Sequence, residues 1–356
     1  MHNIHIAGTG IWYPEDKINN DELVHSYNSY VDLFNTENKE AIENGDVIQM
    51  QQSSVEFIEK ASGIKSRHVI DKNGILDNKR MMPRVDNEHE DRLSIHAIAG
   101  INAAKNALKQ AGISTKDIDA VIVGTSHAAR NYPAVAIEIQ NELQIDGYAY
   151  DMLVGCSSTT FAINNAYSDI ASGLANTILV INPEISTPAV NFTHRDKHFI
   201  FGDGCAATVI QKDSTSDKSF KILDRKLYTK FSNNIRSNYS YLNRAAIDTK
   251  DNEDLLFHQN GRGVFKDVCP LVAKLITDQL ELNKIDPKEI SKFWLHQANG
   301  KMIRLITSKI LGTDDFDSSI TPMPIVDFGN LASVGSLFAF NLDNDLEAGQ
   351  KGVICS

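Results

Sequence analysis

Cysteine is scarce in this sequence, and the residues that occur show no pairing pattern. They are Cys156, Cys205, Cys269 and Cys355, with no CxxC pair and no regular spacing. A structural zinc site or a disulfide framework would need such spacing, so we expect neither. Unpaired thiols are typical of a reducing compartment, which favours a cytoplasmic protein.

Positive charge is also in deficit, with 35 Lys and Arg against 46 Asp and Glu. Sequence-independent nucleic-acid binding normally needs a basic surface, so this class of function is not expected. The sequence contains no apolar run long enough to span a bilayer, and its N-terminus lacks the charged-then-apolar order of a secretory signal. An acidic balance still allows a local basic patch around an anionic ligand.

The sequence does contain the alternation of strands and helices that marks a large folded unit. Its 356 residues are 42% hydrophobic, enough for two domains or for one large two-part domain. Strands are predicted at 3–12, 119–126, 148–154, 177–185 and 201–211, and helices at about 93–110, 135–143 and 157–173. This order predicts an α/β fold whose sheets are covered on both faces.

A polar stretch at residues 212–219 predicts a boundary between an N-terminal half, 1–211, and a C-terminal half, 218–356. The elements predicted in the second half are a strand at 221–229, a helix at 264–282, a strand at 292–296 and a helix at 300–311. Two polar segments interrupt the first half. They are a predicted surface insertion at about 26–56 and a predicted charged loop at 72–91.

Cys156 is the first candidate for chemistry. An apolar strand runs into Gly155 and Cys156, and a helix rich in small residues follows directly. This pattern predicts a sharp strand-to-helix turn, similar in logic to a nucleophile elbow. A helix N-terminus favours the thiolate, which can attack a thioester and carry the acyl group. A lone cysteine is more often a small buried hydrophobe, and the turn makes the two interpretations about equal.

Two further motifs contain polar groups suited to a cleft. His296 ends a predicted strand, and its ordinary pKa suits proton handling or donation to an oxyanion. Asn330 lies in a turn before a helix of small residues, where its amide can donate to a developing enolate oxygen. Each residue alone is more often structural, since a lone histidine is commonly a core residue and a Gly-Asn pair commonly forms a turn.

Taken together, in this order and 140 and 34 residues apart, Cys156, His296 and Asn330 resemble one family. It is the beta-ketoacyl-[acyl carrier protein] synthase III branch of the thiolase superfamily. The segments FGDG at 201–204 and GIKSRH at 63–68 match it as well. The resemblance extends over nearly the whole chain and implies a thiolase-like five-layered αβαβα sandwich of two similar halves, usually a homodimer.

The resemblance also implies a ping-pong acyltransferase that needs no metal and no other cofactor. An acyl-CoA or an acyl carrier protein first transfers its acyl group to Cys156. A malonyl thioester then loses CO₂, and the resulting enolate attacks the acyl group to give a 3-oxoacyl thioester. By this resemblance, His296 and Asn330 donate to the thioester carbonyl oxygen and stabilise the enolate.

Further roles are implied at single positions. Arg195 matches an arginine that contacts the CoA nucleotide. Phe57 matches a tryptophan that stacks on adenine in some members, although the adjoining arginine of those members is Ala61 here. Asn260 and Gly261 match a segment that lines the pantetheine tunnel.

Three more positions concern macromolecular partners. Lys266 and Lys301 match basic positions that dock the acidic carrier protein, and a solvated surface is an equally good interpretation of both. Tyr132 matches an aromatic that reaches into the acyl pocket of the partner subunit. Its simpler interpretation is packing at a dimer interface.

The sequence departs from the family pattern in two places. The insertion and the loop at 74–84 resemble secondary-metabolism relatives, including synthases of dialkylresorcinol precursors, more than the initiator of fatty-acid synthesis. The sequence stops at Ser356, where the family has a Gly-rich loop that supplies a backbone donor to the oxyanion hole and then a last strand.

Three functions therefore stay open. The first is decarboxylative condensation in fatty-acid or polyketide-like synthesis, which the set of Cys, His and Asn favours. The second is malonyl-independent acyl transfer or head-to-head condensation of acyl chains. The third is a non-catalytic partner subunit of an active paralogue.

Overall fold

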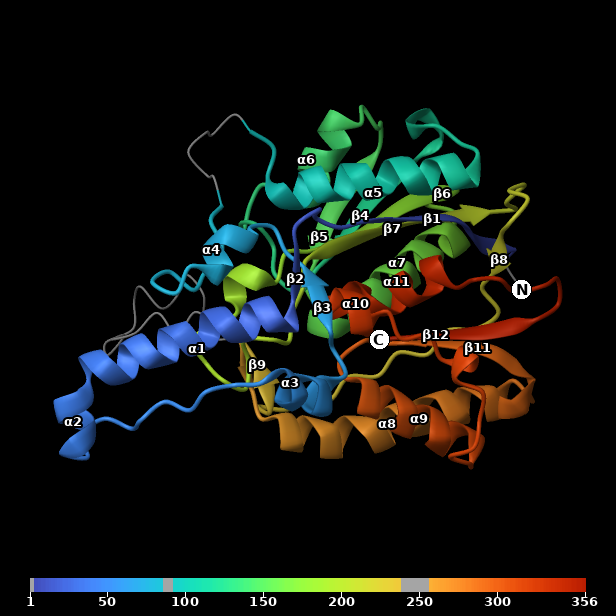
Figure 1. Cartoon of the computed structure of the whole chain (residues 1–356). Coiled ribbons are helices and arrows are strands. Elements are labelled where there is room, and N and C mark those ends of the chain that lie inside the picture. The colour runs from blue at the N-terminus through green and yellow to red at the C-terminus, as the bar shows by residue number, and fades with distance from the viewer. Residues whose placement is uncertain (1–2, 86–91, 238–255) are drawn as a thin grey trace.

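The structure is a computed structural model, and it describes residues 3–85, 92–237 and 256–356. From one outer face to the other, its layers are α5 with α6, a six-stranded sheet, α7 with α11, a two-stranded sheet, and α8 with α9 (Figure 1). The helices of these layers are α5 (Ile95–Ala111), α6 (Val135–Glu142), α7 (Ser158–Ser172), α8 (Gly261–Leu282), α9 (Gly300–Leu311) and α11 (Gly335–Leu342). The predicted five-layered αβαβα fold is confirmed.

The six-stranded sheet has the order β5-β4-β6-β7-β1-β8. Its strands are β1 (Ile4–Trp12), β4 (Ala120–Gly124), β5 (Tyr148–Met152), β6 (Thr177–Glu184), β7 (Gly204–Lys212) and β8 (Phe220–Lys221). β5, β4 and β6 run parallel, whereas β7 is antiparallel to both β6 and β1. The carboxyl ends of β4, β5 and β6 therefore meet at one edge of the sheet, where α/β proteins commonly place their sites.

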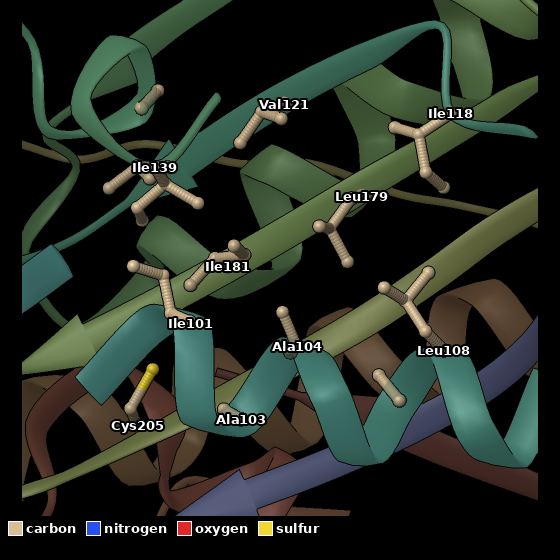
Figure 2. Packing of buried hydrophobic residues seen from close by; sticks show 14 of the residues in the cluster. Ile101, Ala103, Ala104, Leu108, Ile118, Val121, Ile139, Leu179, Ile181 and Cys205 are labelled. Carbon is tan, nitrogen blue, oxygen red and sulfur yellow. The ribbon is translucent and has the colours of Figure 1, made fainter. Parts of the chain in front are cut away.

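Helix α5 shows how the sheet is covered. Its small and aliphatic side chains lie on one face, so the helix packs closely against the strands beneath it. Figure 2 shows Ala104 and Leu108 of α5 facing Leu179 and Ile181 of β6. Gly112 ends the helix in the left-handed conformation, close to the predicted end at residue 110.

The predicted boundary between the halves is too early. β8 follows the polar stretch at 212–219, yet it pairs with β1 and completes the first sheet. Phe220 holds it there by an edge-to-face contact with Phe340, with ring centroids 5.0 Å apart. The strand predicted at 221–229 is also wrong beyond Lys221, because no strand continues there.

The other elements predicted in the second half are present as the helices α8 and α9 and the strand β11 (Ile290–Leu295). Three further strands were not predicted: β12 (Lys351–Cys355), which pairs parallel with β11, and β9 (Ile235–Arg236) and β10 (His258–Gln259), which pair antiparallel with each other. The second sheet thus has two strands in the described part of the chain, against six in the first.

The predicted surface insertion at about 26–56 is wrong for its first part. Helix α1 (Asn20–Glu37) crosses it, and Tyr27 and Val31 are each only 1% exposed. They pack in a core cluster under the helix because α1 presents an apolar side to the body of the protein. Helix α2 (Lys39–Glu43) buries no residue and Ile48 is 90% exposed, so this later stretch does lie at the surface.

The predicted charged loop at 72–91 begins with a short helix, α4 (Lys72–Leu76), which Asp71 caps. Residues 86–91 of that loop lie outside the described residues.

The remaining elements are β2 (Lys17–Asn19), α3 (Val55–Ser62), β3 (Ser66–His68), η1 (Thr115–Asp117), η2 (Gly155–Ser157), η3 (Thr187–Ala189), η6 (Pro287–Glu289), η7 (Ser318–Ile320), α10 (Ile325–Phe328) and η8 (Ala332–Val334). None of the helices in the described ranges is both long and apolar enough to cross a membrane.

Candidate active site

Cys156 lies in the sharp turn that the sequence predicts. β5 ends, the single 3₁₀ turn η2 carries Cys156, and α7 begins two residues later. Gly155 makes the turn with a φ of +54°, in the left-handed region that favours glycine. Ser158 fixes the turn from inside, because its Oγ accepts from the N–H of Val154 at 2.9 Å and donates to the carbonyl of Thr125 at 3.0 Å.

The Cys156 thiol differs from the expected helix-terminal thiolate. Part of the residue is accessible, but protein surrounds the thiol densely. Burial first, and then the negative charge of Glu184, raise the pKa of Cys156 to about 12. The expectation that the helix N-terminus leaves a thiolate is therefore corrected, and the resting group is a thiol.

His296 follows β11 directly and precedes α9. Burial lowers the pKa of His296 to about 4, so the ring is neutral at pH 7. Its Nδ1 is buried without a hydrogen-bond partner. The neighbouring motif residues have structural tasks: Gln297 accepts from the N–H of Ile325 at 3.2 Å, and Asn299 caps α9 through the N–H of Lys301 at 2.9 Å.

Asn330 is held by both its backbone and its side chain. Its N–H donates to the carbonyl of Ile200 at 2.9 Å, and its carbonyl accepts from the N–H of Gly202 at 3.2 Å. Its side-chain Oδ1 accepts from the N–H of Ala332 at 2.9 Å. The backbone around the FGDG segment thus holds the Asn330 turn in place through hydrogen bonds. The side-chain oxygen of Asn330 already accepts a hydrogen bond within the protein.

The three motif segments come together in the structure. The Cys156 turn η2 lies against η8, which follows Asn330. Gly335 at the start of α11 packs on Gln297, next to His296, so closely that a Cβ there would lie 2.7 Å from the Gln297 Cβ. Segments that are 140 and 34 residues apart in the sequence therefore border one another.

Asp203 of FGDG is a buried anchor for this edge of the sheet. Its carboxyl accepts from the N–H groups of Ser186, Thr187 and Ile70 at 2.7, 2.9 and 2.9 Å, and from the Thr187 hydroxyl at 2.6 Å. Burial raises the pKa of Asp203 to about 6. These bonds give the FGDG motif a structural task.

Glu184, at the end of β6, is a residue that the sequence reasoning missed. It is 1% exposed, and burial raises its pKa to about 7. An acidic residue at the carboxyl end of a mostly apolar buried strand is the signal that singles it out in the sequence.

Phe57 and Arg195, the predicted nucleotide-binding pair, are in direct contact. The Arg195 guanidinium carbon lies 3.8 Å from the centroid of the Phe57 ring, and its Nε donates to the carbonyl of Gln52 at 2.8 Å. Phe199 meets the same ring edge-on, with centroids 5.8 Å apart. One face of the Phe57 ring is therefore covered by a cation of the protein itself.

The remaining predicted positions are spread over three regions. Asn260 caps α8, where its Oδ1 accepts from the N–H of Gly263 at 3.1 Å, and Gly261 opens that helix. Lys266 is exposed on α8. Tyr132 is 85% exposed and precedes Pro133 across a cis peptide bond.

Lys301 is exposed in the first turn of α9 and lines a hollow of about 210 Å³. Glu59 and Arg304 border the same hollow, and Gly63 and Met323 are also part of its wall. The α9 face that carries Lys301 is therefore charged and concave.

A larger cavity of about 800 Å³ runs beside β12 and reaches Ser157, next to Cys156. Trp294 and Phe340 lie on its apolar wall. The Ser157 hydroxyl donates to the carbonyl of Ser356 at 3.2 Å, and the Ser356 and Ser336 hydroxyls are 2.6 Å apart. The end of β12 thus packs behind the nucleophile turn.

Solved structures place this fold in a known class. One is the crystal structure of 3-oxoacyl-(acyl carrier protein) synthase III from Pseudomonas aeruginosa, with a TM-score of 0.74, 17% identity, and coverage of 98% of this chain and 92% of that one. Another is the priming beta-ketosynthase of the R1128 polyketide biosynthetic pathway, with a TM-score of 0.72, 20% identity, and coverage of 98% and 89%. The chain therefore has the thiolase-like fold of these two structures.

Sequence relatives narrow the class. The family model for 3-oxoacyl-[acyl-carrier-protein] synthase III matches residues 150–230. A beta-ketodecanoyl-[acyl-carrier-protein] synthase of Pseudomonas aeruginosa is 46% identical over 336 residues, which are 94% of this chain and 96% of the relative. A beta-ketoacyl-[acyl-carrier-protein] synthase III of Streptococcus gordonii is 27% identical over 83% of each chain. The chain belongs to the beta-ketoacyl-[acyl-carrier-protein] synthase III family, and it is an acyltransferase.

Proposed function

We propose that this enzyme loads a medium-chain acyl group on Cys156 and condenses it with a malonyl thioester on acyl carrier protein. CO₂ leaves and a 3-oxoacyl thioester forms. The observation that carries the proposal is the Asn330 side chain. Because its oxygen is engaged by the N–H of Ala332, its amide hydrogens remain to donate to a thioester or enolate oxygen.

The first half-reaction is acyl loading. Cys156 attacks the donor thioester, a new carbon–sulfur bond forms at Cys156, and the bond to the donor sulfur breaks. The resting thiol is protonated, so its proton passes to the departing CoA or carrier thiolate. Atoms and charge are balanced without any metal or cofactor.

The second half-reaction uses His296 and Asn330. Decarboxylation of the malonyl group leaves an electron pair that becomes an enolate, and two fixed donors stabilise its oxygen. A proton on His296 Nδ1 would be a buried N–H without an acceptor, so the Nε2 tautomer is the better donor toward substrate. The enolate carbon then attacks the acyl carbonyl, the bond to the Cys156 sulfur breaks, and the departing thiolate takes up a proton from water.

The relative at 46% identity suggests the length of the donor. Its product, a beta-ketodecanoyl thioester, has ten carbons, of which condensation with a malonyl group supplies two, so this chain is expected to take a donor of about eight carbons. We assign Asn260 and Gly261 to the wall of the tunnel that holds the pantetheine arm of the CoA or carrier-protein donor. We assign the exposed Lys266 and Lys301 to docking of the carrier protein. A homodimer in which Tyr132 reaches the acyl pocket of the partner fits its 85% exposure.

Delivery by CoA fits the site less well than delivery by carrier protein. A CoA adenine needs a free aromatic face, yet Arg195 lies on the Phe57 ring. Stacking on that face requires the guanidinium to swing aside or to clamp the adenine from its other side. The position of Ala61 offers no positive charge for the CoA phosphates.

The test is intact-protein mass after incubation with acyl-CoAs and acyl carrier proteins from two to twelve carbons. An octanoyl adduct on the wild type, absent from Cys156→Ala, is expected, and malonyl carrier protein should then discharge it as a 3-oxodecanoyl product. Failure of every donor to load Cys156 would overturn the proposal. Turnover without malonyl carrier protein would instead favour direct acyl transfer or head-to-head condensation.

A further inference from the structure

Glu184 is a buried carboxyl that takes no direct part in the proposed reaction. Its Oε1 accepts from the N–H and hydroxyl of Ser126 at 2.9 and 3.0 Å, from the N–H of Ser333 at 3.3 Å, and from the Ser333 hydroxyl. A carboxyl removed from water is costly unless donors surround it. Four hydrogen bonds from two serines therefore fix this side chain in one position.

The two serines come from different parts of the site. Ser126 follows β4, at the same sheet edge as Glu184. Ser333 lies in η8, three residues after Asn330, and its hydroxyl oxygen accepts from Thr159 in the first turn of α7 at 3.3 Å. Since α7 begins two residues after Cys156, Ser333 joins the Asn330 segment to the nucleophile helix on one side and to Glu184, at the sheet edge, on the other.

Ala332, the residue directly before Ser333, shows why a tether is needed. Ala332 has a φ of +46°, a left-handed conformation that costs a residue with a side chain about 1–2 kcal/mol. Its N–H is the donor that orients the Asn330 amide. A strained backbone persists only where its neighbours hold it, and the two bonds from Ser333 to Glu184 hold the next residue.

The second carboxyl oxygen of Glu184 is different. Its Oε2 is buried without a hydrogen-bond partner. The charge of Glu184 raises the pKa of two thiols, Cys156 on the nucleophile turn and Cys205 on β7. The same carboxyl thus acts on the nucleophile through its charge and holds the Asn330 segment through Oε1.

We propose that Glu184 is a positioning residue, which holds the Asn330 turn against the nucleophile turn and so aims the Asn330 amide at the enolate oxygen. The inference rests on the proposed function, in which Asn330 acts in decarboxylation and condensation, whereas Cys156 alone carries the acyl group. Loss of the tether should therefore impair the second half-reaction more than the first.

Two substitutions, each of which removes one hydroxyl donor from Glu184 Oε1, provide the test. Ser333→Ala and Ser126→Ala each remove one donor from Glu184 Oε1, but only Ser333 belongs to the Asn330 segment. We expect Ser333→Ala to slow decarboxylation of malonyl carrier protein by about 10–100-fold, because small misplacements of a catalytic group have effects of this size. Ser126→Ala should change it less than threefold, and both should load octanoyl groups at nearly the wild-type rate.

Substitutions of Glu184 itself complete the design. Glu184→Gln keeps an oxygen where Oε1 accepts and should retain most of the decarboxylation rate, whereas Glu184→Ala should lose it to the same extent as Ser333→Ala. Glu184→Gln should also lower the pKa of Cys156, read from the pH dependence of its alkylation, since it removes a negative charge. Equal losses in both half-reactions, or equal effects of the two serine variants, would overturn the inference. A wild type that does not decarboxylate would instead overturn the proposed function.

Discussion

Cys156 shows how strongly the surroundings of a residue decide its chemistry. The start of a helix favours the thiolate, but burial and the Glu184 carboxylate act in the opposite direction and are the larger effects. A protonated resting thiol reacts slowly with oxidants and stray electrophiles, because the thiolate is the nucleophile. When a thioester substrate is bound, hydrogen-bond donors aimed at its carbonyl oxygen then favour attack by Cys156.

This balance leads to a prediction about alkylation of Cys156. With a thiol pKa of about 12, its reaction with iodoacetamide at pH 7.5 should be at least tenfold slower than that of an ordinary cysteine with a pKa of about 8.5. The rate should keep rising up to pH 10. Peptide mass spectrometry after timed quenching measures it, with Cys156→Ser as the control for labelling elsewhere. A rate that levels off below pH 8 would contradict the prediction.

The candidate residues differ in how far the sequence could identify them. Cys156 was recognisable because a strand, a glycine and a small-residue helix make a local pattern. The orientation of Asn330 was not, because it depends on Ile200, Gly202 and a strained Ala332. The Arg195 contact with Phe57 was equally hidden, since a rotamer and a bond to Gln52 decide it.

At the scale of elements, the nucleophile turn depends on a single glycine. Gly155 has a φ of +54°, and a Cβ added there would have no neighbour within 4 Å, so replacement by alanine strains only the backbone. Gly173, which ends the same helix α7 at a φ of +81° with the same free space, is a matched control.

Both Gly155→Ala and Gly173→Ala should lower the free energy of unfolding by about 1–2 kcal/mol. Only Gly155→Ala should slow octanoyl loading, by about tenfold or more, because relief of its strain displaces Cys156. Urea unfolding and loading rates measured on both variants decide this. Equal loading by the two variants would show that the turn tolerates displacement.

Helix α1 allows a second comparison between elements. Val31 is buried under it, whereas Ile48, in the stretch after α2, is 90% exposed. Val31→Ala should lower the free energy of unfolding by about 2 kcal/mol through lost burial and a small cavity, and Ile48→Ala should change it by less than about 0.5 kcal/mol. Chemical unfolding of both variants tests this, and similar losses would mean that the whole segment packs alike.

The same helix explains where prediction of the fold succeeds and fails. Elements with strong local signals, such as α5 between a serine cap and Gly112, are predicted nearly to the residue. Polar α1 resembles a surface insertion in the sequence because its few apolar residues are spaced among asparagines and acids. Strand β8 falls in the wrong predicted half, since two residues show no pattern and only the long-range pairing with β1 places them.

At the scale of the whole molecule, the five layers bring distant segments to one place. The parallel strands β4, β5 and β6 end at the edge where Ser126, Cys156 and Glu184 lie. The C-terminal half adds His296 after β11 and Asn330 before α11. A catalytic set assembled from both halves requires the layers to be rigid, and the buried polar residues beneath the site contribute to this rigidity.

Several buried polar groups of the protein are histidines, which couple the stability of the whole molecule to pH. Burial lowers the pKa of His96 and His296 to about 4 and that of His198 to about 3. In the unfolded chain a histidine titrates near a pH of about 6.5. Below that pH each of these histidines is protonated in the unfolded state but still neutral in the folded state. Each one therefore makes unfolding more favourable as the pH falls from about 6.5 toward the pKa of that histidine in the folded state.

Carboxyl groups act in the opposite direction over part of this range. The pKa values of Glu184 and Asp203 are raised to about 7 and 6, so the folded state holds protons that the unfolded state has lost. The contribution of these carboxyls to the free energy of unfolding therefore rises as the pH falls through the same window. The wild type and a variant that lacks one histidine share these carboxyl contributions, so the difference between their stabilities shows the pH dependence that this histidine causes.

His198→Phe is the variant best suited to this comparison. The His198 ring stacks on Tyr27, with centroids 4.4 Å apart, and meets Phe199 edge-on, contacts that a phenyl ring can keep. The variant loses the 2.8 Å bond between Nδ1 and the carbonyl of Arg195, which should cost about 1 kcal/mol at pH 7.5. Between pH 6.5 and pH 5 it should lose less stability than the wild type by roughly 1–2 kcal/mol, since one histidine contributes up to about 1.4 kcal/mol per pH unit. Urea unfolding at half-unit pH steps measures the difference, and parallel curves for the two proteins would show that His198 is protonated in the folded state as readily as in the unfolded one.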